Sequence, residues 1–177
     1  MSQSVLDPSG WFKFTGPMPY VAVSGFAVGP CGRFPILYRG DKVRSARNCW
    51  ALPSGLHEVG LTAEQQFAVE LKEELNLDLI PGTAEPVFMY ENIMPGEPGV
   101  GGGWHWVILV LAAKVKTLDT LRNAEPDKHP NIDMVDLRSF PYADGFWTLN
   151  WAPSLGRALN QHQQRVMSSV LKLGQTA

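Results

Sequence analysis

The sequence is poor in cysteine and contains no long apolar run. Its 177 residues include two cysteines, Cys31 and Cys49, which form no Cys-x-x-Cys pair, so we expect reduced thiols rather than a disulfide framework. No apolar stretch approaches the roughly 18 residues of a transmembrane helix. The N-terminus also lacks the charged segment and apolar core of a secretory leader. These absences predict a cytoplasmic protein without a membrane partner.

An excess of either charge is missing as well. The net charge is -2 and the basic residues are scattered, so neither a nucleic-acid polymer nor an acidic membrane is indicated as a partner. The chain shows no internal repeat and no interdomain linker. A length of 177 residues suits one domain, and we predict a single domain over residues 1–177 with its core over about residues 18–173. The sequence leaves a homodimer open.

The sequence does contain three glutamates, Glu70, Glu73 and Glu74, on one predicted helix. Helix neighbours lie three or four positions apart, and none of those positions holds a lysine or an arginine. The like-charge pairs among them therefore cost the helix about 0.2–0.5 kcal/mol each. A divalent cation would reverse that cost, so the arrangement predicts a metal site. The alternative is an acidic helix face exposed to solvent.

The neighbouring residues predict where this helix begins and what it packs against. Thr62 and Gln65 form a capping box, so the helix should begin near Ala63. Four apolar residues follow at a spacing of four and must pack on a core: Ala63, Phe67, Leu71 and Leu75. Residues 50–55 predict a short extended segment that ends in a Pro-Ser-Gly turn. The loop backbone would thus lie against the acidic face.

These residues resemble the signature of the Nudix hydrolases. In that signature a glycine is followed, after five residues, by a glutamate, and after seven more by Arg-Glu-hydrophobic-x-Glu-Glu-x-Gly-hydrophobic. Gly55 opens the match, residues 70–74 (ELKEE) supply its acidic centre, and Leu77 closes it without an insertion. The lead-in of residues 50–55 is also similar to the family.

Three positions depart from the signature: Leu61 replaces its first glutamate, Val69 its arginine and Asn76 its glycine. Asn76 suits the position just beyond the helix, because asparagine is the next choice after glycine for a left-handed backbone. In the family the glutamate and arginine pair and fix the loop to the helix, and replacing both by apolar residues can be neutral. We expect a contact between Leu61 and Val69 to keep the loop in place.

The resemblance implies an α/β fold, an α/β/α sandwich with a mixed β-sheet. It implies a hydrolase of nucleoside diphosphates linked to another group, nucleoside triphosphates included, that uses Mg2+ or Mn2+ and takes a small-molecule nucleotide as its substrate. Glu73 and Glu74 would be the principal metal ligands, Glu70 a ligand or the base that orients water, and the Gly55 carbonyl a further ligand. Glu70 and Glu73 are therefore predicted catalytic residues as well.

A protein of the same fold that binds a nucleotide without cleaving it, or with weak activity, is the alternative function. The apolar Leu61 and Val69 favour this regulatory or binding role. The intact trio of glutamates opposes it.

A second and shorter motif lies at Glu125-Pro126-Asp127-Lys128. It resembles the Glu-Pro-x-Lys stretch of Nudix enzymes that act on nucleoside triphosphates. The resemblance implies that Glu125 approaches the metals from outside the helix as a third catalytic residue, with Asp127 behind it. The alternative is a Pro-rich turn ahead of a strand over residues 132–137.

Three residues are predicted to bind the substrate. Arg39 and Lys42 would contact phosphate, because they lie just before the strand that enters the metal-binding turn. The alternative is that residues 41–48 form an ordinary solvated loop. Trp147, or Trp151 in its place, could stack on a nucleobase or pack beneath the C-terminal helix.

Other features are expected to be structural. Residues 95–103 are rich in glycine and proline and lack the ending of a phosphate-binding P-loop. They predict a mobile hairpin connection that could close over the substrate. His105 is expected to be a strand residue and His57 a solvent-facing loop residue.

Periodicity predicts the remaining elements. Strands are expected over residues 20–28, 34–38, 86–91, 104–115 and 132–137. In the first strand Val21, Val23 and Phe26 should be buried. Ser154 is expected to cap one C-terminal helix that ends before Gly174 and buries Leu155, Leu159, His162, Val166, Val170 and Leu173.

Overall fold

The computed structural model describes residues 5–6, 12–13, 18–43, 46–94, 104–139 and 142–175. Near the N-terminus two short strands, β1 (Val5–Leu6) and β2 (Phe12–Lys13), pair with each other in antiparallel fashion. The Gly/Pro-rich connection expected over residues 95–103 lies outside the described residues. No helix in the described ranges is long and apolar enough to cross a membrane.

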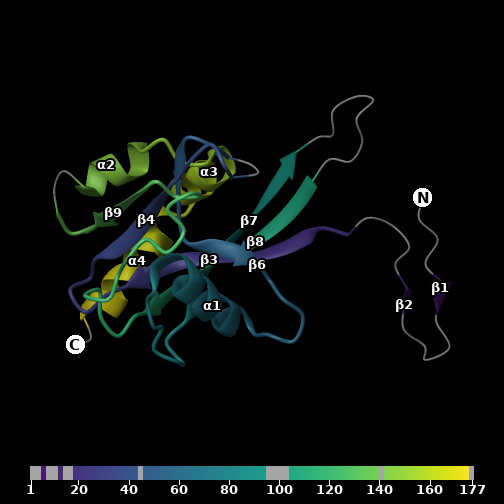
Figure 1. Ribbon diagram of the computed structural model, residues 1–177, viewed down its shortest axis with the longest axis horizontal. Coiled ribbons are helices and arrows are strands. Elements are labelled where there is room, and N and C mark those ends of the chain that lie inside the picture. The colour runs from purple at the N-terminus through teal and green to yellow at the C-terminus, as the bar shows by residue number, and fades with distance from the viewer. Residues whose placement is uncertain are drawn as a thin grey trace.

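A mixed four-stranded sheet forms the centre of the fold, in the order β6-β3-β8-β7 (Figure 1). The two inner strands, β3 (Tyr20–Val28) and β8 (Trp104–Lys114), run parallel. The outer strands, β6 (Ser54–Leu56) and β7 (Glu85–Met94), run antiparallel to their neighbours. The run over residues 104–115 is long and apolar enough to predict a central strand, and β8 is one of the two inner strands.

A second, antiparallel sheet has the order β5-β4-β9. Its strands are β5 (Cys49–Ala51), β4 (Phe34–Arg39) and β9 (Asn131–Val135). The Pro-Ser-Gly turn predicted at the end of residues 50–55 needs correction, because Ser54 and Gly55 belong to β6, and the segment is divided between two sheets. β9 ends two residues earlier than predicted, and the Asp136 carboxylate accepts a hydrogen bond from the Arg138 backbone N–H at 2.9 Å.

Helices cover the central sheet on both faces. α1 (Ala63–Leu75) packs on one face, and α3 (Pro153–Gln161) and α4 (Gln163–Gln175) pack on the other (Figure 1). A further short helix, α2 (Tyr142–Thr148), was not predicted and precedes α3. The arrangement is the predicted α/β/α sandwich with a mixed sheet.

Side-chain alternation along β3 divides the core into two clusters. Val23 and Ala27 pack with the apolar stripe of α1, whereas Phe26 and Val28 belong to the cluster beneath α3 and α4. The prediction that Val21 is buried was wrong, because this side chain is 48% exposed. Val21 shares the face of Val23, but it lies outside the cluster that α1 covers.

The ends of α1 match the prediction. The Thr62 hydroxyl accepts from the Gln65 backbone N–H, the Gln65 side chain accepts from the Thr62 N–H, and the two bonds form the expected capping box. Asn76 ends the helix in the left-handed conformation, with φ 55°. Local interactions thus determine where the acidic helix starts and stops.

The C-terminal prediction needs correction, because two helices replace the one expected. The chain breaks at His162, whose ring is only partly buried and stacks on Phe88 at 5.1 Å. The N-cap is Ala152, and the Ser154 hydroxyl instead donates to Asn92 Oδ1. α4 continues through Gly174, where a Cβ atom would come within 2.7 Å of the backbone of Gly32. This glycine therefore serves close packing and does not end the helix.

Candidate active site

Gly55 on β6 lies directly against the carboxylate of Glu70 on α1. A Cβ atom at position 55 would come within 1.9 Å of Glu70 Oε1, so only glycine permits this approach. The signature residues at the two ends of this contact are thus brought together as their spacing predicts. Their roles as metal ligands remain a proposal.

Gln66 connects the loop before α1 to the acidic face of the helix. Its side chain is buried, with 1% of the residue exposed. Its Nε2 donates to Glu70 Oε1 at 2.7 Å, and its Oε1 accepts from the Glu58 N–H at 2.9 Å. Gln66 was not predicted as a site residue. Its position one turn before Glu70 is the sequence feature that indicates a contact between the two side chains. A Leu61–Val69 contact remains a prediction, and the hydrogen-bonded link to the loop runs through Gln66.

Glu70 has a perturbed acidity. Burial raises the pKa of its carboxyl to about 7, the Gln66 hydrogen bond opposes this rise, and the charges of Glu74, Glu73 and Glu125 add to it. In the metal-free protein this group therefore exchanges its proton near neutral pH. A pKa in this range suits a general base, and a cation would relieve the smaller part of the rise that comes from the neighbouring glutamates.

Glu74 is the buried carboxylate of the helix, with 6% of the residue exposed. Its Oε2 accepts from the Ser54 backbone N–H at 3.1 Å, and its Oε1 lies 3.4 Å from His129 Nε2. The backbone of the same residue accepts from the Ala124 N–H at 3.0 Å. This bond holds the loop that follows β8 against the end of the helix.

That loop places Glu125 and His129 beside Glu74. One oxygen from each glutamate and one ring nitrogen of His129 all lie within 4.8 Å of one another. Glu125 thus lies beside Glu74 from a loop outside the acidic helix, and it also accepts a hydrogen bond from Lys128 at 2.5 Å. His129 was not predicted, and its only sequence signal is its place four residues after Glu125.

Besides Glu70, two other predicted acids lie outside this cluster of Glu74, Glu125 and His129. Glu73 is exposed on α1, although its charge is close enough to raise the pKa of Glu70. Asp127 pairs with Lys42 on the surface at 2.7 Å, and this partner lowers the pKa of the aspartate. The fold therefore separates the buried acids from the exposed ones.

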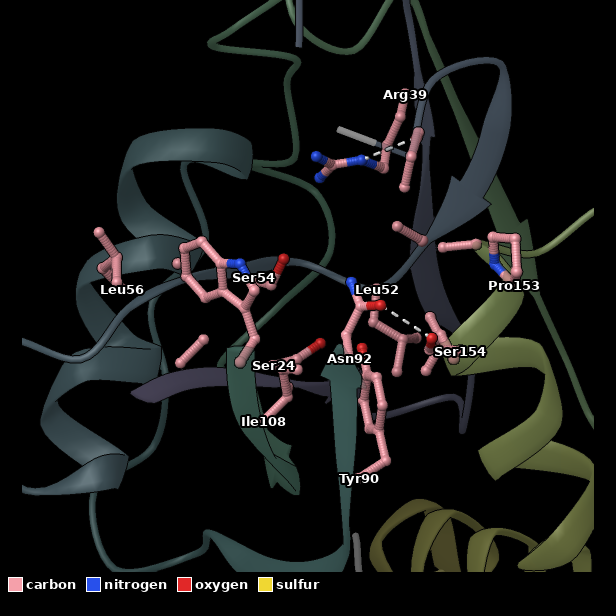
Figure 2. Close-up of a pocket in the computed structure, with 17 residues that line it drawn as sticks. Ser24, Arg39, Leu52, Ser54, Leu56, Tyr90, Asn92, Ile108, Pro153 and Ser154 are labelled. Carbon is pink, nitrogen blue, oxygen red and sulfur yellow. Dashed lines mark hydrogen bonds between the residues drawn. The ribbon is translucent and has the colours of Figure 1, made fainter. Parts of the chain in front are cut away.

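A cavity of about 490 Å³ lies beside Glu70 and Glu74, and Figure 2 shows the residues that line it. Its walls come from β3 to β8 and the start of α3. The lining includes Arg39, Ser54, Gly55, Asn92, Trp106 and Ser154. Ser54 and Gly55 belong both to the cavity wall and to the contacts with the helix carboxylates, so the two features share one edge.

Polar groups in the cavity are few and oriented. The Ser154 hydroxyl donates to Asn92 Oδ1 at 3.0 Å, as Figure 2 shows, and this bond leaves the Asn92 NH2 group as the donor available to a ligand. Burial raises the pKa of Tyr90 to about 12, so its phenol stays protonated at neutral pH. The cavity thus combines apolar walls with a small number of hydrogen-bond donors.

The structure separates the three predicted substrate-binding residues. Arg39 lines the cavity, and its Nε donates to the Ala46 carbonyl at 3.1 Å. Lys42 is on the surface in its ion pair with Asp127. Trp147 packs edge-on against Phe146, with the ring centroids 4.8 Å apart, and it does not line the cavity.

The structure also shows where two further tryptophans and His105 lie. Trp151 is buried and its Nε1 donates to the Phe146 carbonyl at 2.7 Å, as expected for packing. The tryptophan that does line the cavity is Trp106, which stacks on Tyr20 with 5.0 Å between ring centroids. His105 is a strand residue, as predicted.

The donor set fits a divalent cation. Glu70, Glu74 and Glu125 offer the carboxylate oxygens that Mg2+ and Mn2+ prefer. The His129 Nδ1 atom is buried and makes no hydrogen bond within the described part of the chain. Repelling carboxylates beside a buried imidazole, whose other nitrogen Nε2 lies 3.4 Å from Glu74 Oε1 without a hydrogen bond, are what a bound cation would satisfy.

Solved structures share this architecture. A MutT Nudix hydrolase from Burkholderia pseudomallei matches with a TM-score of 0.54 and 25% identity, over 71% of this chain and 88% of that one. The Nudix domain of Shewanella oneidensis NrtR complexed with ADP ribose matches with a TM-score of 0.57 and 14% identity. This match covers 90% of this chain and 93% of that one. A third match is a Francisella tularensis bifunctional NMN adenylyltransferase/ADP ribose pyrophosphatase complexed with AMP and a manganese ion. Its TM-score is 0.56 and its identity 16%, over 85% of this chain and 43% of that one.

These likenesses show that the chain has a Nudix fold, as its signature predicts. No family model matches the chain, and no curated protein matches its sequence. At these identities the shared architecture concerns the fold, and activity has to be argued from the site itself.

Proposed function

We propose that this protein is a metal-dependent pyrophosphohydrolase that cleaves nucleoside diphosphates linked to another group, nucleoside triphosphates included. One observation carries the proposal: the cavity and the acidic cluster share an edge. Ser54 donates to Glu74, Gly55 lies against Glu70, and both Ser54 and Gly55 line the cavity. A nucleotide with its nucleoside in the cavity would present its phosphates to the carboxylates.

The size and lining of the cavity support a nucleoside as the occupant. A volume of about 490 Å³ is within the usual range for small-molecule sites. Trp106 offers an aromatic face to a base, and the Asn92 NH2 group offers a donor. The Shewanella oneidensis Nudix domain was solved with ADP ribose and the Francisella tularensis bifunctional enzyme with AMP, and these ligands support a nucleoside as the occupant.

The residues at the shared edge divide the chemistry between them. Glu70, Glu74 and Glu125 would hold Mg2+ or Mn2+, with Glu73 and the Gly55 carbonyl as further ligands by family resemblance. When bound, the ion neutralises phosphate oxygens and makes a coordinated water more acidic. Glu70 would also orient the attacking water and accept its proton, the role that the family resemblance gives it.

The substrate contacts are proposed in the same way. Arg39, on the cavity wall, would contact phosphate oxygens. Lys42 would have to leave its ion pair with Asp127 to do so, and Trp147 would have to leave Phe146 to stack on a base. Trp106 already faces the cavity, so we assign it the base-stacking role ahead of Trp147.

A substrate panel tests the proposal. Nucleoside triphosphates, nucleotide sugars, ADP-ribose and dinucleoside polyphosphates should be assayed with magnesium and with manganese. Glu70→Gln should reduce turnover by about 10²-fold or more, as expected for loss of a general base. Glu64→Gln is the matched control on the same helix, because its side-chain oxygen can still accept from the Gly82 N–H. The proposal fails if no substrate gives metal-dependent turnover above the Glu70→Gln background.

A nucleotide-binding protein without hydrolysis is the second candidate. The apolar Leu61 and Val69, which stand where the family has an ion pair, favour it. Measurable nucleotide binding by calorimetry without turnover on the panel would select this function. Binding accompanied by turnover that Glu70→Gln removes would select the hydrolase.

A further inference from the structure

His129 is a buried histidine that the proposed chemistry does not yet use. The residue is 3% exposed. Its backbone N–H donates to the Glu125 carbonyl at 2.9 Å, and its carbonyl accepts from Asn123 Nδ2 at 2.5 Å. The loop therefore fixes the imidazole at the turn that carries Glu125.

The imidazole faces a carboxylate without an ordinary hydrogen bond. Its Nε2 lies 3.4 Å from Glu74 Oε1, whereas the other carboxylate oxygen of Glu74 is already bound by the Ser54 N–H. Its Nδ1 is buried and makes no hydrogen bond to a residue that the structure describes. The feature that a shared ion would explain is the 3.4 Å gap between the buried Nε2 and Glu74 Oε1, and Nδ1 lies on the other side of the ring.

The spacing of the donor atoms matches a shared ion. Two ligand atoms that each lie about 2.1 Å from one ion are separated by roughly 3.0 to 3.4 Å, for right-angled to tetrahedral arrangements. The 3.4 Å between Glu74 Oε1 and His129 Nε2 lies at the upper end of that interval. Glu125 adds an oxygen within 4.8 Å of both.

We propose that His129 is a nitrogen ligand of the metal site, and that the resident ion is consequently a divalent first-row transition ion of the manganese-to-zinc series rather than magnesium. Imidazole is a ligand for transition ions, whereas Mg2+ is bound through oxygen and keeps much of its water. Two carboxylates and one imidazole therefore select against magnesium. This inference rests on the proposed metal site of the hydrolase and adds the identity of its ion.

Manganese is the probe for the test. The full chain, stripped of metal and loaded with Mn2+, should show nitrogen coupling from a coordinated imidazole in pulsed electron paramagnetic resonance. His129→Gln places an amide oxygen in the same region and should abolish that coupling. Substitution of residues that only hydrogen-bond metal ligands typically costs about 10–100-fold in metal affinity. The loss of a direct ligand should therefore weaken Mn2+ binding by at least that much. Mg2+ affinity, measured by calorimetry on the same samples, should change little.

His105→Gln is the matched control, because this half-buried histidine lies on β8 beside Glu91 at 3.6 Å, away from the cluster. It should preserve both the coupling and the Mn2+ affinity. If His129→Gln does not fold, the Mn2+-loaded wild type with 15N-labelled histidine decides the case, because the isotope must change the coupling.

Two results would overturn the inference in different ways. Absence of imidazole coupling in a wild-type protein that binds Mn2+ and hydrolyses nucleotides would remove His129 as a ligand and leave the proposed function intact. Failure of the wild type to bind Mn2+ at all would remove the metal site and the proposed function together.

Discussion

The Gln66 side chain donates to Glu70 Oε1 at 2.7 Å, and the same amide accepts from the backbone of the preceding loop. One buried side chain thereby joins the loop after β6 to the carboxylate that we propose as the base. In the family signature a glutamate and an arginine provide that link, and in this chain Leu61 and Val69 occupy their positions. In this chain the neutral Gln66 side chain therefore makes a hydrogen-bonded link between loop and helix, where the family has an ion pair.

Replacing Gln66 by alanine should loosen the loop and leave the Glu58 N–H without its partner. The free energy of unfolding should fall by about 1–3 kcal/mol, the usual penalty for an unpaired buried group. Loss of the hydrogen bond should also move the Glu70 pKa further upward, because that bond lowers it. Urea denaturation and the pH profile of turnover measure the two effects. Gln164→Ala on the exposed face of α4 is the control, and an equal loss in both variants would contradict the bridging role.

Gly55→Ala should damage the site more than the fold. The added methyl group would meet the Glu70 carboxylate and displace it. We expect metal affinity to fall by about 10-fold or more, by analogy with substitutions that misorient metal ligands. Gly145→Ala in α2 is the matched control, since a Cβ atom there meets nothing within 4 Å. Calorimetric titration with Mn2+ distinguishes the two variants, and unchanged affinity in Gly55→Ala would show that this approach is not needed.

The metal-free protein should lose stability as the pH rises. The folded-state pKa of Glu70, about 7, lies above its ordinary value of 4.5, so folding favours the protonated carboxyl. The contribution of Glu70 is fully present below pH 4.5, is lost as the pH rises toward 7, and stays lost above it. Urea denaturation in a chelator should therefore show a smaller decline between these pH values in Glu70→Gln than in the wild type. Identical declines would contradict the raised pKa.

Restoring half of the family's ion pair should destabilise the chain. Val69→Arg places a charge beside an apolar loop position, and we expect a loss of about 1–3 kcal/mol in the free energy of unfolding where that charge is desolvated. Adding Leu61→Glu should recover part of that loss. A double-mutant cycle by chemical denaturation measures the coupling. A coupling energy near zero would mean that the two positions do not interact.

The sequence by itself determined the acidic helix and its fold family. The capping box at Thr62, the apolar stripe and the left-handed Asn76 act within a few residues, so the helix begins and ends where the pattern predicts. The signature spacing also predicted the Nudix fold, because it encodes the contact between Gly55 and Glu70. Local chemistry was sufficient for these features.

Only the tertiary structure decided the rest of the site. His129 meets Glu74 although 55 positions separate them in the chain, and Ser154 donates to Asn92 across 62 positions instead of capping its helix. The exposure of Val21 likewise depends on how far α1 covers the sheet. The apolar pattern within β3 does not contain that information. Such contacts follow from which strands become neighbours. The cavity, the histidine of the cluster and the choice among tryptophans therefore became visible only when the sheet was assembled.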